Sequence, residues 1–229
     1  MLKITIPNNN IAERKYILDI IFDEFLGLEY KVEARREKVE GDWEIELENG
    51  SKIIFEDHFF NKYLNNLEYL KLENIPSKVE FAQNQFIVEN NIPVIYGNSK
   101  LETKNDELET KNQKLKTIIC GIDIFASCFF MLTRWEEYVN KKRDRLNRFS
   151  AIESLSFKNN FLDRPIVNEY IEMLWNMLID LGYEIKRKER KFELILTHDV
   201  DFLLLSQTPK KVIIKTFLGD ILKRKNIKL

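Results

Sequence analysis

Trp43-Glu44-Ile45-Glu46-Leu47-Glu48-Asn49-Gly50-Ser51-Lys52-Ile53-Ile54-Phe55 is the stretch that decides the fold. Its first five residues alternate apolar and polar side chains, and its last four are rich in β-branched and aromatic residues, which is typical of strands. The Asn-Gly pair between the two runs is a strong hairpin signal, because both residues tolerate a positive φ. The stretch therefore predicts two strands joined by a tight turn.

The residues before this hairpin predict a strand, a helix and a further strand. Residues 2–6 alternate apolar and polar side chains and stop at Pro7. Asn10 can cap a helix that is closed by Gly27, and its apolar stripe consists of Ile11, Ile17, Leu18, Ile21, Phe22 and Phe25. Residues 28–34 predict the next strand. The first part of the chain is therefore a mixed α/β unit.

The middle of the chain contains a short internal repeat. Residues 101–107 read Leu-Glu-Thr-Lys-Asn-Asp-Glu, and residues 108–114 read Leu-Glu-Thr-Lys-Asn-Gln-Lys. One apolar residue per heptad does not make the two-position seam of a coiled coil, and two copies are too few. We expect a solvated loop insertion over residues 98–117, after a short strand at 92–96.

The second half is more helical. Residues 122–132 are apolar nearly all round, which predicts a buried helix that continues through 138 and places Trp135 in the core. Asp163 is a candidate cap, with Pro165 in the first turn of the last helix before Gly182. Arg134 and Arg164 are expected to form ordinary ion pairs with neighbouring glutamates, and the basic run 141–145 to be a solvated face.

Composition limits the possible partners and the compartment. The 229 residues are 44% apolar and carry a formal net charge of -1, so no global field recruits nucleic acid or an anionic membrane. No basic region followed by an apolar region marks a signal peptide, and no apolar stretch is long enough to span a bilayer. Cys120 and Cys128 are expected to be reduced core thiols. A cytoplasmic protein is expected.

The chemistry is concentrated near residue 200. Residues 192–197 predict a strand that leads into His198-Asp199-Val200-Asp201. Side chains alternate along a strand, so Asp199 and Asp201 would point the same way. Paired carboxylates repel each other, and either a divalent cation or a retained proton relieves this repulsion. The alternative is a turn in which the aspartates cap the backbone.

Thr197-His198-Asp199-Val200-Asp201 resembles the opening motif of the polysaccharide deacetylase family. In that family the motif ends the first strand of a distorted (β/α) barrel, and the substrate is an N-acetylated glycan. The resemblance implies that Asp199 is the catalytic base and Asp201 a ligand of zinc or another divalent metal. The spacer Val200 matches only the Asp-x-Asp branch of the family.

The upstream residues carry a second resemblance. Residues 123–127, 133–138 and 161–170 are similar to an uncharacterised domain that precedes deacetylase domains in many bacterial proteins. The expected fold is therefore α/β: a mixed leading domain over 1–190, then the first strand and helix of an incomplete deacetylase-like barrel over 191–229.

The chain departs from the deacetylase pattern in one respect that decides its activity. It contains two histidines, His58 and His198, and no His-x-x-x-His. His198 would face away from Asp201, and His58 is expected to be a surface or packing residue. A catalytic zinc takes three protein ligands, and a complete barrel needs roughly 200 residues or more. We expect an inactive front portion that does not bind the metal tightly.

Two other functions remain open. A non-catalytic module could bind a glycan or a protein partner, and a metal-dependent glycosyltransferase could use Asp199 and Asp201 to hold a nucleotide-sugar through manganese. Metal binding that depends on a nucleoside diphosphate would favour the transferase, whereas no metal binding would favour the module.

Overall fold

The computed structural model describes residues 1–35, 41–63, 65–110, 113–189, 191–197, 210, 214, 215 and 218, with only the backbone at 106–110 and 113–114. The chain divides into two units, Met1–Glu189 and Arg190–Leu229. The elements in chain order, with η marking 3-10 and π helices, are β1 (Leu2–Ile6), α1 (Ile11–Leu18), η1 (Asp19–Leu26), β2 (Tyr30–Ala34), β3 (Trp43–Glu46), β4 (Lys52–Phe55), η2 (Phe60–Lys62), η3 (Leu72–Asn74), β5 (Glu80–Ala82), β6 (Ile92–Val94), β7 (Gly97–Thr110), β8 (Gln113–Ile122), α2 (Ile124–Thr133), α3 (Trp135–Val139), η4 (Ala151–Glu153), α4 (Leu155–Lys158) and α5 (Ile166–Asp180).

A mixed six-stranded sheet organises the first unit. Its strand order is β2-β1-β3-β4-β8-β7, and a separate pair is formed by β5 and β6. The predicted hairpin is confirmed, with β3 antiparallel to β4 and Trp43 opposite Phe55. The β1–β2 and β4–β8 pairs are parallel, and the other pairs of this sheet are antiparallel. The α/β prediction therefore holds for this unit.

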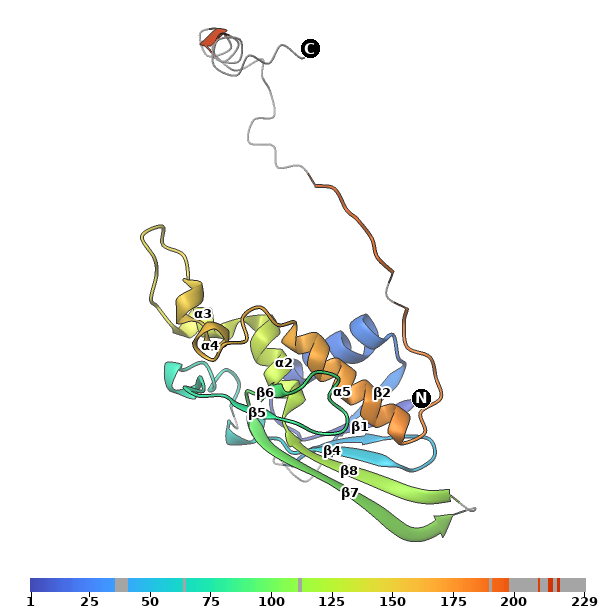
Figure 1. Cartoon of the computed structure of the whole chain (residues 1–229). Coiled ribbons are helices and arrows are strands. Elements are labelled where there is room, and N and C mark those ends of the chain that lie inside the picture. Colours follow the sequence, from blue (N-terminus) through green and yellow to red (C-terminus); the bar gives the residue numbers. More distant parts are fainter. Residues whose placement is uncertain are drawn as a thin grey trace. The chain divides into compact units, whose positions relative to one another are not determined.

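The helices cover one face of the sheet (Figure 1). Alternate residues of the central strands turn toward them and are fully buried, among them Ile4, Ile45 and Phe55. The intervening residues face the other side, where Lys52 contacts Glu44 at 2.7 Å. Alternation of buried and polar residues is the pattern of a sheet with one solvated face. The core is therefore a single layer between sheet and helices.

The first helix occupies the predicted range but changes form along it. α1 continues directly into the π-helix η1, and Gly27 ends it with a φ of +63°. Asn10 lies at the predicted cap position, yet its side chain does not cap the helix. Its Nδ2 instead donates to the Tyr63 carbonyl at 2.6 Å. The Asn10 side chain therefore links the start of α1 to the loop at Tyr63 rather than capping the helix.

The segment predicted as a loop insertion is a long β-hairpin instead. β7 and β8 pair antiparallel, with Glu102 opposite Ile119 and Lys104 opposite Thr117. β8 also pairs with β4, so its other edge offers free backbone groups to residues 97–110. Strand pairing uses backbone hydrogen bonds, which a polar repeat supplies as well as an apolar one. The loop prediction was therefore wrong.

The second half follows the predicted helices with two corrections. α2 is buried as expected, but it ends at Arg134, whose φ is +51°, and α3 begins at Trp135. Trp135 lies in the core, as predicted. α5 begins at Ile166 with Pro165 before it, so Asp163 is not its cap, and Gly182 follows it with a φ of +83°. Cys120 and Cys128 are both buried and free.

The predicted strand at residues 192–197 is absent. These residues form no regular structure, and Phe192 and Leu196 are 92% and 86% exposed. A lone strand gains no ladder hydrogen bonds, and no described residue of Arg190–Leu229 belongs to a neighbouring strand. No barrel closes among the described residues. Lys210, Ile214, Lys215 and Leu218, the described residues after 197, are helical, and they lie in the range 191–229 where a helix was expected.

No helix in the described ranges is both long enough and apolar enough to cross a bilayer.

We predict that Gly97→Ala destabilises the first unit. Gly97 has a φ of +103°, and a Cβ there would lie 2.1 Å from the Gly121 carbonyl oxygen. Because both the backbone conformation and the close approach reject a side chain, the loss should be about 2–3 kcal/mol in the free energy of unfolding. Urea denaturation measures it. Ser99→Ala, an exposed change in the same strand, is the control, and equal midpoints for the two variants would contradict the prediction.

Candidate functional site

The residues on which the sequence placed the chemistry lie outside the described residues. Asp199, the predicted base, and Asp201, the predicted metal ligand, are both in this group, together with His198 and Val200. Their roles therefore stay predictions.

The described residues do not form a zinc site. No group of three or more His, Cys, Asp and Glu side chains among them could hold a metal ion. His58 follows β4, and its Nε2 lies 3.0 Å from Glu56 Oε2. The other Glu56 oxygen accepts from Lys100 Nζ at 3.1 Å. One imidazole and one lysine-paired carboxylate do not reach the three protein ligands that a catalytic zinc takes.

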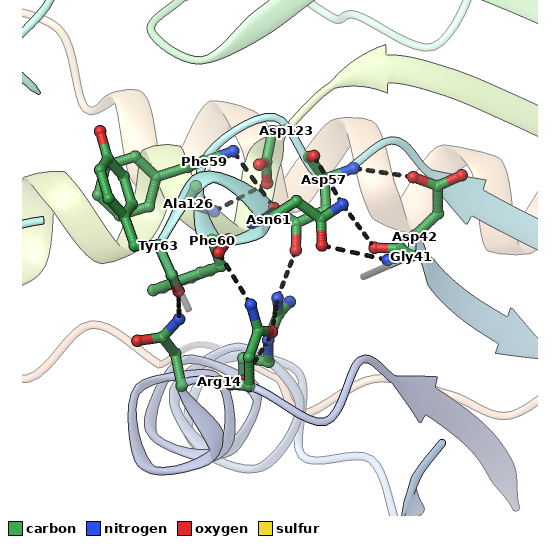
Figure 2. Close-up of polar contacts among 12 residues, drawn as sticks. Arg14, Gly41, Asp42, Asp57, Phe59, Phe60, Asn61, Tyr63, Asp123 and Ala126 are labelled. Atoms are coloured by element: carbon green, nitrogen blue, oxygen red, sulfur yellow. Dashed lines mark hydrogen bonds and ion pairs between the residues drawn. The ribbon is translucent and has the colours of Figure 1, made fainter. Parts of the chain in front are cut away.

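The residue pattern did not predict the buried ion pair that Arg14 and Asp57 form inside the unit. Arg14 of α1 places Nη2 2.5 Å from Asp57 Oδ2, and both side chains are fully buried. Figure 2 shows Arg14 reaching from the helix toward Asp57, on the loop after β4. The contact is an ion pair without hydrogen-bond geometry, whereas Arg14 Nε donates to the Asn9 carbonyl at 2.8 Å. The guanidinium also lies 4.5 Å from the centre of the Trp43 ring.

Two aspartates hold the backbone of the loop that begins at Asp57. Asp57 Oδ1 accepts from the Asn61 amide at 3.2 Å. Asp123 Oδ2 accepts from the His58 amide at 3.0 Å. Its Oδ1 accepts from the Ala126 amide at 3.0 Å and caps α2, and Figure 2 shows this second contact. The loop is therefore fastened to α1 through Asp57 and to α2 through Asp123.

Burial dominates the electrostatics of this cluster. It raises the pKa of Asp123 to about 8, with the negative charge of Asp57 adding to the effect. Burial also raises the pKa of Asp57, although the Arg14 charge acts in the opposite direction. The three groups are sealed in the core, so the cluster contributes structure rather than substrate chemistry.

A sequence signal for this cluster existed. Arg14 lies three residues after Ile11 and four before Leu18, inside the apolar stripe of the first helix. A charged residue at such a position must be paired when it is buried. Its partner, Asp57, could not be identified because it lies 43 residues away on a loop.

The surface has a hollow that we name the Arg134 cleft. It has a volume of about 300 Å³, and its polar lining comes from Arg134, Glu136, Glu137, Ser154 and Ser156. Phe130, Met131 and Phe149 supply apolar walls. Figure 1 shows α3 and α4 next to the end of α2, and the Leu155 amide of α4 donates to Glu136 Oε2 at 2.9 Å. Mixed polar and apolar walls in a concave site are typical of small-ligand binding.

A larger hollow lies beside η1 and β2. It has a volume of about 630 Å³, and Asp19, Asp23, Glu29 and Tyr30 are among its lining residues. Tyr30 donates to Asp19 Oδ1 at 2.5 Å, so its hydroxyl hydrogen is already used. Acidic surface groups alone do not define a ligand.

Comparison with known proteins gives one match. The model of a family described as a family of unknown function (DUF7033) matches residues 2–183. No curated protein and no solved structure matches the chain.

We predict that Arg14→Met costs about 3–5 kcal/mol of stability, because it leaves Asp57 buried without its counter-charge. Urea denaturation measures the loss, and Lys15→Met on the exposed side of the same helix is the control. The double variant Arg14→Met/Asp57→Asn should recover part of the loss, since no net charge is then buried. A double variant that loses the sum of both single losses would contradict this account.

We predict that Asp123 makes the unit less stable as pH rises from about 4 to 8. The raised pKa, about 8, means that the folded carboxyl keeps its proton over this window while the unfolded one loses it. The free energy of unfolding therefore falls by up to about 1.4 kcal/mol per pH unit from this group. Asp123→Asn should flatten the dependence, and the exposed control Glu80→Gln should not. Urea titrations across this pH range give the free energy of unfolding for each protein. If it changed with pH equally in the wild type and in Asp123→Asn, the prediction would be contradicted.

Proposed function

This chain belongs to the DUF7033 family of unknown function, and we propose that its Met1–Glu189 unit is the leading, recognition part of a metal-dependent polysaccharide deacetylase-like protein. The observation that carries the proposal is the order of the parts. The family match ends at residue 183, and the motif that resembles the deacetylase opening begins at Thr197. A recognition unit would then lie directly before a catalytic segment.

On this proposal Asp199 acts as the base and Asp201 as a ligand of zinc or a similar metal. The described residues supply no metal site, and a catalytic zinc needs further protein ligands. Histidines outside these 229 residues would have to provide them. The first strand of a barrel would form from residues 192–197 once a neighbouring strand is present, which would bury Phe192 and Leu196.

The Arg134 cleft supports a recognition role for the first unit. It combines a guanidinium, two carboxylates and two hydroxyl groups with aromatic and thioether side chains. Such a mixture suits a glycan, which presents hydroxyl groups at its rim and C–H groups on its faces. A glycan- or protein-binding module that acts without any deacetylase is the second candidate, and the same cleft favours it.

We predict that the reading frame continues past Leu229 and encodes a His-x-x-x-His segment. The extended product should release acetate from N-acetylglucosamine oligomers in a zinc-dependent reaction. Asp199→Asn should lower kcat by about 10²-fold or more, because the base is lost. Glu193→Gln, a nearby exposed carboxyl, is the matched control.

The 229-residue chain alone should release no acetate, because its metal ligands are incomplete. Zinc-dependent turnover by this chain, or an extended frame without the histidines, would contradict the catalytic proposal. Manganese binding that requires a nucleoside diphosphate would favour a glycosyltransferase instead.

A further inference from the structure

Arg134 supplies an exposed positive charge to the lining of the cleft. Arg134 lies between α2 and α3 with a φ of +51°, and its side chain is 70% exposed. A left-handed conformation in a non-glycine residue costs on the order of 1 kcal/mol, and here it ends α2. The guanidinium contacts Glu137, so these two charges form one paired unit at the rim.

Two hydroxyl groups on the cleft wall leave an acceptor free. Ser154 Oγ donates to the Ala151 carbonyl at 2.6 Å and accepts from the Phe157 amide at 3.2 Å. Since a hydroxyl has one hydrogen, Ser156 Oγ must be the donor in its 3.2 Å contact with Ser154. Ser156 as a residue is 6% exposed, and its Oγ accepts from no group in the described part of the chain.

Glu136 presents a second acceptor. Its Oε2 accepts from the Leu155 amide, which fixes the carboxylate against α4. Its Oε1 has no hydrogen-bond partner within the described ranges. With Glu136 and Glu137 against Arg134, the polar lining has a net charge of -1. Arg143 is not a lining residue of the cleft, and three of its five N–H groups donate to the carbonyls of Asn140, Lys142 and Glu137.

A ligand that fits this lining is rich in donors, carries a positive charge and has an apolar face. Hydroxyl groups can donate to Glu136 and Ser156 and accept from Arg134. The walls formed by Phe130, Met131 and Phe149 suit the C–H face of a pyranose ring. A volume of about 300 Å³ is at the small end of ligand pockets, which matches a single sugar residue.

We propose that the Arg134 cleft binds one amino-sugar residue of a glycan, with the free ammonium group on the side of Glu136. The inference rests on the proposed function and makes it more specific, because a free amino sugar is what deacetylation produces. The carboxylate of an acidic sugar would be repelled by Glu136 and Glu137, which line the cleft. An N-acetylated sugar has no ammonium group, so it cannot form an ion pair with these two residues. The first unit would thus hold the glycan by residues that have already been deacetylated.

The test is a binding titration of the 229-residue chain with three probes, a glucosamine tetramer, an N-acetylglucosamine tetramer and a galacturonic acid tetramer. Binding is reported by the chemical shifts of the cleft amides or by the fluorescence of Trp135, whose ring centroid lies 5.3 Å from that of the cleft residue Phe130. The glucosamine tetramer should bind about tenfold more tightly than the acetylated one, since a charge-assisted hydrogen bond is lost with the acetyl group. The acidic tetramer should not bind.

Glu136→Gln should weaken glucosamine binding about tenfold. Glu153→Gln removes the same charge from the neighbouring surface, where Glu153 pairs with Lys142 and Lys158, and should leave the affinity unchanged. Equal urea midpoints for the two variants confirm that the fold is intact. If Glu136→Gln unfolds the chain, Arg134→Gln, with an exposed side chain, provides the second variant.

Three results would overturn the inference: no binding of the glucosamine tetramer, equal or tighter binding of either other tetramer, or an affinity that both glutamate variants change alike. The catalytic part of the proposed function and the ligand of the cleft can be rejected independently of each other. Cleft binding with no acetate release by the extended product would reject the catalytic part, whereas acetate release without cleft binding would reject the cleft.

Discussion

The pair formed by Arg14 and Asp57 is the constraint on which the rest of the first unit depends. A buried charge is costly unless its partner is held in place, and here the partner begins the loop after β4. Asp123 fastens the same loop to the start of α2 by accepting from the His58 amide. One polar cluster thus fixes how a helix, a strand end and a second helix meet. Because the cluster is sealed, its role is to hold the architecture that other surfaces use.

The close approach of β7 and β8 delivers Asp123 to that cluster. Gly97 lets its backbone approach the Gly121 carbonyl without a Cβ between them, Gly121 leaves room for the Asn98 side chain, and the Asp123 amide donates to the Tyr96 carbonyl. α2 begins immediately afterwards and runs through the core to Arg134, where the left-handed backbone turns the chain into α3. The Arg134 cleft therefore lies one helix away from the buried pair. Its position depends on the same fastening, although its chemistry is independent of it.

The proposed division of labour follows from this arrangement. The described unit offers a cleft with free hydrogen-bond acceptors but no set of three metal ligands. Asp199 and Asp201, in contrast, follow the mostly apolar residues 192–197. These residues can form the hydrogen bonds of a strand only when another strand lies beside them. A recognition unit followed by a catalytic segment accounts for both features. The glycan would then be held by one part of the protein and processed by the next.

Residue patterns alone determined the central hairpin, the first helix and its end at Gly27, the buried α2 and the core place of Trp135, because local periodicity and turn chemistry act over a few residues. They misassigned 98–117, since strand pairing there depends on the free edge of β8 rather than on an apolar pattern. They also predicted a strand at 192–197, but the described residues include no neighbouring strand with which it could pair. Arg14 stood visibly in an apolar stripe, but its partner Asp57 and the lining of the Arg134 cleft come from distant segments. Only the tertiary structure decided these, because contacts between segments far apart in the chain leave no local signal.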